Sequence, residues 1–404
     1  MFDVDKIRRD FPLLGAEVYG KPLAYLDNGA TAQKPEAVLR AMDDIYRQSN
    51  GNIHRGAHHM SNLVTTLYEE ARQSVARFIG APDAATVIFT SGATASLNAV
   101  AASYGSMAVG RDDEVIVTYM EHHANIVPWQ MLCQRKGARL LAVPLAADGS
   151  LDMESYLDML SDRTRIVAVT QASNVLGAMP DLPAVIEAAH RAGARVVVDG
   201  CQGVVHGGVD VTALDCDFYA FSGHKLYGPT GIGVLYGRRE LLEQMPPYMG
   251  GGDMVDTVTF EKTTYAELPL KFEAGTTDYI GAIGLGAAVR YLEGIDIKGA
   301  LEHEQSLVRY AVDKLSQVEG LRIYGPKERC PIVSFNIEGV HGMDAGMILD
   351  KMGVAVRTGT HCAQPLMSFY GVRGMVRASM AFYNTHHEID RLKEAVDRAV
   401  MMLK

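Results

Sequence analysis

The chain has 404 residues, and its 48 acidic against 38 basic side chains give a formal charge of −10. Lysine and arginine form no basic block, so the composition argues against a nucleic-acid partner. No apolar run reaches the length of a membrane span, and the first residues are acidic where a signal peptide is basic. We therefore expect no membrane partner and a cytoplasmic location.

Strand-like and helix-like segments alternate from residue 62 to residue 236, as in βα units. Predicted helices cover residues 62–78, 125–136 and 182–192. Predicted strands are short apolar runs, many of them rich in β-branched residues, at 86–90, 114–118, 139–143, 166–170, 195–199, 218–221 and 231–236. This alternation predicts an α/β fold whose large domain contains a doubly wound, mostly parallel, seven-stranded sheet.

The pattern changes at about residue 280. Helical patterns then cover 283–292 and 301–318, shorter strands follow, and a last helix is predicted at 387–403. This order predicts a smaller, C-terminal α+β domain. We divide the chain into an N-terminal segment, 1–25, that packs with the small domain, a large domain, 26–282, and the small domain, 283–404. No low-complexity linker separates them, so we expect firm packing.

Cysteine usage predicts neither a disulfide framework nor a metal site. The chain has five cysteines, an odd number, and none stands in a CxxC pair or at a metal-like spacing. Cys133, Cys201 and Cys216 lie in or beside apolar stretches and are expected to be inert core thiols. The other two are Cys330 and Cys362.

Two side chains at the ends of predicted strands indicate a cofactor site. Lys225 follows the strand at 218–221 and precedes a glycine-rich stretch, where a partly desolvated amine can form a Schiff base with pyridoxal phosphate. Asp199 ends the strand at 195–199, and its carboxylate can pair with a protonated pyridine nitrogen. Taken alone, Lys225 could be an ordinary surface lysine and Asp199 a helix cap. The two residues together favour a cofactor site.

Two further segments suit the rest of such a site. Residues 91–96 follow a strand and open a helix at about Leu97, so they fit a phosphate site or a plain helix cap. His122 and His123 lie between a strand and a helix, where one of them can stack on a pyridine ring or pass protons. A capping role is open for both, and the composition does not choose between them.

Several motifs follow one another in a fixed order along nearly the whole chain. They occupy residues 25–35, 54–56, 121–130, 173–177, 198–202, 222–233, 272–276, 357–365 (Arg-Thr-Gly-Thr-His-Cys-Ala-Gln-Pro) and 377–379. Together they resemble the SufS-type (group II) cysteine desulfurases and selenocysteine lyases, which belong to the class V aminotransferase-like enzymes of fold-type I. The resemblance implies a homodimer that uses pyridoxal phosphate.

The implied reaction converts L-cysteine to L-alanine. Lys225 is similar in position to the Schiff-base lysine that also removes the Cα proton, and His122 to the histidine that stacks on the ring. Cys362 matches the thiol that takes the sulfur as a persulfide. A SufE-like or SufU-like acceptor protein then receives the sulfur for iron–sulfur cluster assembly.

The resemblance also implies the binding residues. Asp199 matches the partner of the pyridine nitrogen, Gln202 a donor to the ring hydroxyl oxygen, and Asn174 a residue between that hydroxyl and the substrate carboxylate. Phosphate contacts are matched by Thr94, Ser222, His224 and, from the other subunit, Thr276. The substrate is bound by Arg377, Arg357, Asn174 and His54. Among these, the planar fork of Arg377 suits a carboxylate, and His54 matches the substrate entrance.

The surroundings of Cys362 bear on its reactivity. Arg357 and His361 are close in sequence, and we expect their charge to favour the thiolate, which is the competent nucleophile. The segment at 357–365 lacks the long mobile loop of the IscS-like group, so an acceptor protein must approach it. Ala93 and Ala95 replace residues that relatives commonly carry in the phosphate turn.

Three other functions stay open. A selenocysteine lyase has less need of Cys362, because the C–Se bond is weaker. The second alternative is an aminotransferase or a kynureninase-like hydrolase, in which Cys362 has no role. The third is a non-catalytic scaffold, which would be colourless because it would bind no cofactor.

Overall fold

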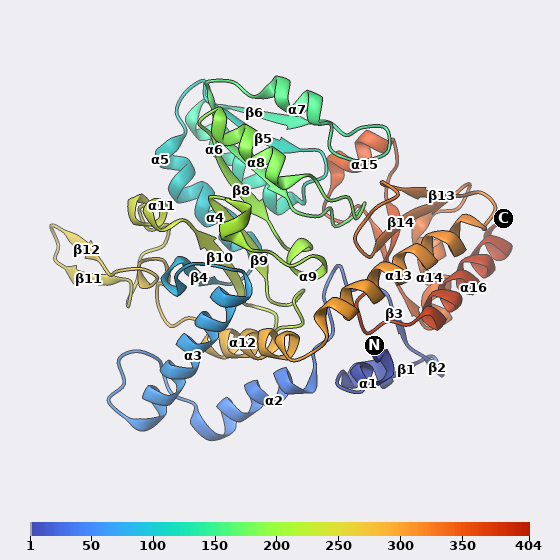
Figure 1. Cartoon of the computed structure of the whole chain (residues 1–404), viewed down its shortest axis with the longest axis horizontal. Coiled ribbons are helices and arrows are strands. Elements are labelled where there is room, and N and C mark those ends of the chain that lie inside the picture. Colours follow the sequence, from blue (N-terminus) through green and yellow to red (C-terminus); the bar gives the residue numbers. More distant parts are fainter. Residues whose placement is uncertain (1) are drawn as a thin grey trace.

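A computed structural model describes residues 2–404 (Figure 1). Its central sheet has the strand order β4-β10-β9-β8-β7-β5-β6. Neighbouring strands are parallel, except that β10 runs antiparallel to β9 and β4. The strands are β4 (Val87–Thr90), β5 (Glu114–Thr118), β6 (Arg139–Val143), β7 (Thr164–Thr170), β8 (Arg195–Asp199), β9 (Phe218–Ser222) and β10 (Gly233–Gly237). The predicted seven-stranded, mostly parallel sheet is confirmed.

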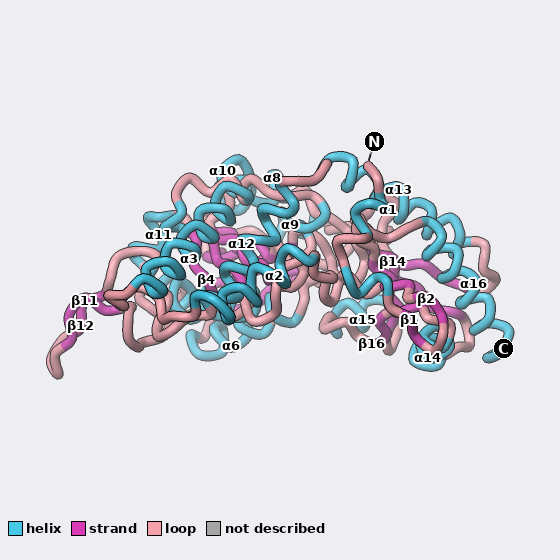
Figure 2. The backbone as a smooth tube through the Cα atoms, turned by 90° about the horizontal axis from the view of Figure 1, so that it is seen from below, coloured by secondary structure: helices cyan, strands magenta, loops and turns pink. Residues whose placement is uncertain are grey.

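Helices cover both faces of this sheet (Figures 1 and 2). Along β8, Val196 and Val198 join the core beneath α3, α8 and α12, whereas Val197 joins the core beneath α4, α6 and α11. A sheet buried on both faces needs apolar residues at every position, which explains the uninterrupted apolar runs. The helices of this part are α2 (Glu36–Asp44), α3 (His59–Phe78), α4 (Ala93–Val100), α5 (Ser106–Ala108), α6 (Val127–Lys136), α7 (Met153–Met159), α8 (Leu182–Arg191), α9 (Gly203–His206), α10 (Val211–Leu214), α11 (Arg239–Gln244) and α12 (Tyr279–Glu293).

The C-terminal part contains an antiparallel sheet of four strands in the order β13-β14-β17-β16. Helices α13, α14 and α16 share a separate apolar core with it. The strands are β13 (Leu321–Tyr324), β14 (Ile332–Ile337), β16 (Arg357–Gly359) and β17 (Met375–Ser379), and the helices are α13 (Ile297–Ser316), α14 (Gly342–Lys351), α15 (Gln364–Tyr370) and α16 (His386–Leu403). This is the predicted smaller α+β unit, beside the large sheet (Figure 1).

The N-terminal segment contacts this C-terminal part. Helix α1 (Val4–Arg8) ends on Arg8, which pairs with Glu388 of α16 at 3.0 Å. Two short strands, β1 (Glu17–Val18) and β2 (Lys21–Pro22), come next in the chain. The strand that follows them, β3 (Ala24–Tyr25), pairs with β15 (Val354–Ala355). These contacts join the described part of the N-terminal segment to the C-terminal part, and the predicted division of the chain at residue 25 stays a prediction.

The proposed boundary at residue 282 falls inside α12. The helix begins at Tyr279, four residues before the predicted start, because the Asp278 side chain caps it by accepting the Gly281 N–H at 2.7 Å. Helix α12 packs on α2 and α3 and shares the core of the large sheet. We therefore propose that the two domains divide between α12 and α13, at residues 294–296.

A two-stranded hairpin, β11 (Val255–Val258) and β12 (Thr263–Tyr265), projects from the end of the molecule opposite the C-terminus (Figures 1 and 2). Its tip exposes Val258 and, completely, Phe260. Within residues 2–404, no helix combines the length and hydropathy that crossing a bilayer requires.

A buried ion pair anchors the segment that follows this hairpin. Arg72 of α3 and Glu273 are each 1% exposed at their side chains, and their closest atoms lie 2.6 Å apart. Glu273 also accepts hydrogen bonds from the Tyr68 hydroxyl and the Phe89 N–H, each at 2.7 Å. The pair ties residues 272–276 to α3 and β4.

We expect Glu273→Ala to destabilise the protein by about 3–5 kcal/mol, because the substitution leaves the Arg72 charge buried without its main partner. Urea unfolding measures the change. The matched control is Glu69→Ala, which removes a partly exposed partner of the same arginine, 2.9 Å away, and should cost less than about 1 kcal/mol. Equal effects of the two substitutions would contradict the prediction.

Candidate active site

A cavity of about 240 Å³ lies where the large sheet meets the C-terminal part. This volume is below the roughly 300–1,000 Å³ of pockets for drug-sized ligands and suits a small cofactor. Residues from both parts of the chain line it: Gly29, Ala30, Ala93, Thr94, His122, Ala124, Asn174, Asp199, Cys201, Ser222, His224, Lys225, Arg357, His361, Cys362 and Arg377. Ten of the thirteen predicted site residues are in this set.

Asp199 and Lys225 lie at the ends of two neighbouring strands of the large sheet. Asp199 is the buried last residue of β8, and its Oδ1 accepts the Cys201 N–H at 3.0 Å. Lys225 follows β9, the next strand. The parallel register therefore brings an amine and a carboxylate to one end of the sheet, as the sequence predicted.

The turn that carries Lys225 is held through the carbonyl oxygen of His224. This oxygen accepts hydrogen bonds from the Ala32 N–H at 3.0 Å and from Thr31 Oγ1 and Lys34 Nζ, each at 3.1 Å. Burial lowers the pKa of Lys34 to about 8. This support for Lys225 was not predicted from the sequence.

The structure distinguishes the two histidines. His122 lines the cavity, and its Nδ1 accepts the Ala124 N–H at 3.1 Å. Burial and the Lys225 charge lower its pKa to about 4, so the imidazole is neutral at neutral pH. His123 is not a lining residue of this cavity. This arrangement supports His122 as the ring-stacking residue.

The phosphate end of the cavity is formed by α4 and the turn after β9. Helix α4 starts at Ala93, not at about Leu97 as expected, because Gly92, with a φ of 144°, turns the chain there. Ser222 Oγ accepts the Ala93 N–H at 2.9 Å. Thr94 and His224 lie on the same wall and border a second, open hollow in front of α4. A helix N-terminus with hydroxyl groups suits a phosphate.

The cavity therefore fits pyridoxal phosphate by the chemistry of its groups. An amine, a carboxylate, a neutral imidazole and a helix N-terminus with hydroxyls correspond to its aldehyde, ring nitrogen, ring face and phosphate.

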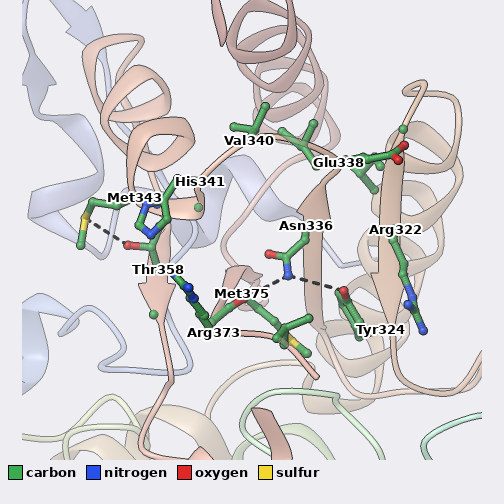
Figure 3. Close-up of a pocket in the computed structure, with 17 residues that line it drawn as sticks. Arg322, Tyr324, Asn336, Glu338, Val340, His341, Met343, Thr358, Arg373 and Met375 are labelled. Atoms are coloured by element: carbon green, nitrogen blue, oxygen red, sulfur yellow. Dashed lines mark hydrogen bonds between the residues drawn. The ribbon is translucent and has the colours of Figure 1, made fainter. Parts of the chain in front are cut away.

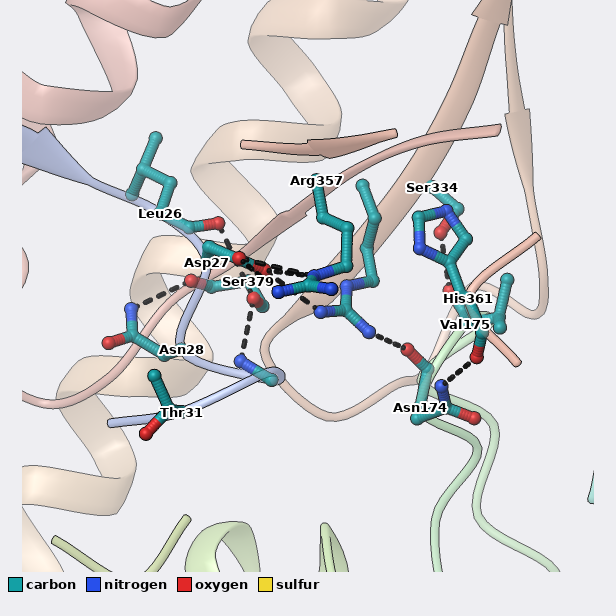
Figure 4. Close-up of polar contacts among 12 residues, drawn as sticks. Leu26, Asp27, Asn28, Thr31, Asn174, Val175, Ser334, Arg357, His361 and Ser379 are labelled. Carbon is teal, nitrogen blue, oxygen red and sulfur yellow. Dashed lines mark hydrogen bonds and ion pairs between the residues drawn. The ribbon is translucent and has the colours of Figure 1, made fainter. Parts of the chain in front are cut away.

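Two arginines share one carboxylate beside this site (Figure 4). The register of β16 and β17 sets Arg357 opposite Arg377, and Asp27 pairs with each of them at 3.0 Å. Arg377 Nη1 also donates to the Asn174 carbonyl oxygen at 2.8 Å. Asp27 lies far from both arginines in the sequence and was not predicted. It fixes the orientation of the buried Arg377 guanidinium.

Cys362 differs from the other four cysteines of the chain, because it is exposed and they are buried. Burial raises the pKa of Cys133 to about 11 and those of Cys201, Cys216 and Cys330 to about 12, so these thiols stay protonated. Only a thiolate is a strong nucleophile. The position of Cys362 is the one suited to reaction with a ligand.

The expectation that His361 favours the Cys362 thiolate by charge is wrong. Its Nε2 lies 2.9 Å from the Met375 carbonyl oxygen. Burial and the Arg377 charge lower its pKa to about 3, so the imidazole is neutral. Arg357 keeps its charge: hydrogen bonds to Asp27 raise its pKa, and Cys362 adds a smaller contribution.

Three predicted residues do not line the cavity. Gln202 is buried and donates from Nε2 to the carbonyl oxygen of Gly29, a lining residue, at 2.8 Å. His54 is half-buried against Tyr68. Thr276 is exposed just before α12. The roles given to these residues stay predictions.

A larger cavity, of about 610 Å³, lies in the C-terminal part (Figure 3). Its lining includes Arg322, Asn336, His341 and Arg373, but no lysine. None of the predicted site residues lines it, so it is separate from the candidate site, although Gly359 of its wall is three positions before Cys362.

Two histidines of the cavity, the buried His361 and the half-buried His122, predict how stability varies with pH in the cofactor-free protein. An unfolded histidine binds a proton below about pH 6.5, whereas His122 and His361 stay neutral until about pH 4 and 3. The unfolded state then binds more protons, so the free energy of unfolding falls as pH drops from 6.5 to 4. The slope is at most about 1.4 kcal/mol per pH unit for each histidine.

Urea unfolding at several pH values measures this slope. His361→Gln, which keeps a donor for the Met375 carbonyl oxygen, should flatten it. An unchanged slope in that variant argues against the prediction.

Comparisons with known proteins agree with this geometry. Residues 24–392 match the aminotransferase class-V family. A protein named cysteine desulfurase from Salmonella agona (strain SL483) is 50% identical over 403 residues, which cover 100% of this chain and 99% of the relative. The structure of the cysteine desulfurase CsdA from Escherichia coli, in its S-sulfonic acid form, is 45% identical with a TM-score of 0.94, covering all of both chains.

The apo structure of a cysteine desulfurase from Thermococcus onnurineus NA1 has the same TM-score, 0.94, at 37% identity, and covers 100% of this chain and 99% of that one. Both the sequence and the fold are thus similar from end to end. The predicted class-V family, the likeness to cysteine desulfurases and the fold class are confirmed. The chain belongs to the class-V aminotransferase family and, within it, to the cysteine desulfurases.

Proposed function

We propose that the protein is a cysteine desulfurase that takes sulfur from L-cysteine onto Cys362, releases L-alanine and passes the sulfur to an acceptor protein. Pyridoxal phosphate is its cofactor, held by the cavity described above. The observation that carries the proposal is the single cavity in which Lys225, Asp199, His122 and the exposed Cys362 meet. The full-length similarity to cysteine desulfurases supports it.

Arg377 holds the substrate carboxylate. The Nε atom of this buried side chain has no hydrogen-bond partner within residues 2–404, while its Nη atoms are fixed by Asp27 and Asn174. A guanidinium held in this way presents free N–H groups to a carboxylate with little loss of entropy. Arg357 contributes a second positive charge at the same place.

Lys225 and Cys362 carry out different steps of the reaction. Lys225 removes the Cα proton. Pyridoxal phosphate, which Lys225, Asp199 and His122 would hold, would supply the electron sink for this step. The Cys362 thiolate attacks the substrate sulfur, so an S–S bond forms as the Cβ–S bond breaks. The electron pair of the broken bond stays with the carbon skeleton, which is protonated to alanine.

The acceptor is a SufE-like or SufU-like protein. Cys362 is exposed, but the neighbouring His361 is buried and its ring is hydrogen-bonded to the Met375 carbonyl oxygen. A thiol on so short a segment cannot travel, so the acceptor must come to the cavity. Iron–sulfur cluster assembly is the proposed destination of the sulfur.

The active unit is a homodimer. The projecting β11–β12 hairpin exposes Phe260 completely, and Thr276, the expected phosphate contact of the other subunit, is exposed. A large apolar side chain on an arm suits contact with a second copy. A monomer at micromolar concentration in sedimentation velocity would contradict this part of the proposal.

The mass of the Cys362 peptide after treatment with L-cysteine tests the proposed reaction. We expect the mass of one added sulfur atom, removed by a thiol reductant, together with formation of alanine. Alanine without sulfur on Cys362 would point to selenocysteine lyase-like elimination, and a 2-oxoacid product to an aminotransferase.

A further inference from the structure

His123 contacts the backbone of Cys362 itself and of Gln364, two residues further on. Its backbone N–H donates to the Cys362 carbonyl oxygen at 2.7 Å. Its side-chain Nε2 accepts the backbone N–H of Gln364 at 3.1 Å. The proposed reaction gives this residue no role, since it does not line the cofactor cavity.

The contact with Gln364 completes a helix end. Gln364 is the first residue of α15, and its N-cap, Ala363, provides no side-chain hydrogen bond. The first N–H groups of a helix have no acceptor within the helix and need one from elsewhere. His123, from the turn after β5, supplies that acceptor.

The segment needs such restraint, because its backbone conformation is unfavourable. His361 and Cys362 both adopt left-handed conformations, with φ of 52° and 54°. Side chains other than glycine enter this region at a cost, and they stay there when the surroundings hold them. Asn174 Nδ2 donates to the His361 carbonyl oxygen at 2.9 Å, so bonds hold the residues just before, at and after the thiol.

His123 is itself firmly placed. It begins a short 3-10 turn, in which its carbonyl oxygen accepts the Ile126 N–H at 3.1 Å. Beneath the turn, fully buried Glu121 accepts the Asn125 side-chain amide at 2.6 Å and the Thr170 N–H at 2.9 Å. The imidazole therefore stands on a rigid support at the end of the large sheet.

We propose that His123 is a positioning residue for the nucleophile: its imidazole acts as the missing cap of α15 and so holds the Cys362 thiol toward the cavity. This inference rests on the proposed function in one respect, the role of Cys362 as nucleophile. The hydrogen-bond acceptor for the Gln364 N–H must carry a free lone pair, as the unprotonated Nε2 of His123 does. The side-chain oxygen of a glutamine can supply such a lone pair as well.

The test compares His123→Leu with His123→Gln. We expect His123→Leu to lower kcat for L-cysteine by about 10- to 100-fold, because a nucleophile displaced by about 1 Å loses rate on that order. KM and the visible absorbance of the cofactor should change less than about twofold. His123→Gln should recover most of kcat, since it keeps an acceptor for the Gln364 N–H.

Hydrogen exchange provides a readout apart from catalysis. The Gln364 amide should exchange faster in His123→Leu than in the wild type, and at nearly the wild-type rate in His123→Gln. Unchanged exchange in His123→Leu, or equal loss of kcat in both variants, overturns the inference. Failure of the proposed function is distinguishable, because it appears as desulfuration that survives Cys362→Ser, whatever the exchange result.

Discussion

Cys362→Ser is expected to lower the rate of sulfur release from L-cysteine by on the order of 10³-fold or more, while the protein keeps the visible absorbance of its cofactor. A serine hydroxyl at this position is not ionised at neutral pH and cannot accept sulfur as a persulfide. The groups that bind the cofactor are other side chains of the cavity, so cofactor binding should be unaffected.

The matched control is Cys201→Ala. Cys201 lines the same cavity, but burial raises the pKa of its thiol to about 12, so it is protonated and inert. We expect this variant to keep sulfide production, measured with a reductant present, within about threefold of the wild type. Full desulfuration by Cys362→Ser would disprove the assignment of the nucleophile.

A comparison of the wild type with Cys362→Ser on two substrates separates sulfur from selenium chemistry. A selenocysteine lyase eliminates selenium with less need of a thiol, because the C–Se bond is the weaker one. If Cys362→Ser retains activity on L-selenocysteine and loses it on L-cysteine, both reactions occur at this site by different routes. Loss of both activities makes Cys362 essential to each.

Lys225→Ala should have the second large effect. It removes both the amine that binds the cofactor covalently and the base at the substrate Cα, and loss of a general base alone costs about 10²- to 10⁴-fold. We expect at least that loss in kcat. Borohydride reduction should fix the cofactor to the Lys225 peptide of the wild type, and mass spectrometry should find no such adduct in the variant.

Lys34 is the control for this experiment. Burial lowers its pKa to about 8, and its amine donates to the carbonyl oxygen of His224, the residue before Lys225. Its lowered pKa makes Lys34 a nearby lysine whose amine could also react with an aldehyde, but Lys34 does not line the cavity. A borohydride adduct on Lys34 of the wild-type protein would show that the covalent role had been given to the wrong lysine.

Local sequence patterns predicted the large sheet well, because a strand buried on both faces must be apolar throughout. The starts of α12 and α13 were missed by four residues each, since their capping aspartates, Asp278 and Asp296, stand before stretches with glycine that weaken the helical pattern. Both caps are visible in the sequence as an aspartate before the helix.

The candidate site was predicted through motifs, and its missing members are those that depend on tertiary contacts. Asp27 reaches Arg357 and Arg377 because the preceding strand, β3, pairs with β15 of the C-terminal part. The neutral state of His361 follows from burial, which its sequence neighbours do not indicate. Residues that act through distant partners carry no local signature.

The cluster of Asp27 with Arg357 and Arg377 holds two cationic groups and one anionic group, a formal excess of one positive charge. An amino acid that enters with its carboxylate supplies the missing counter-ion and makes the cluster electrically balanced. Alanine carries the same carboxylate as cysteine, so the product is retained by the same charge balance. We therefore expect release of alanine, and any discrimination between sulfur and selenium, to be decided at the side-chain end of the substrate, beside Cys362.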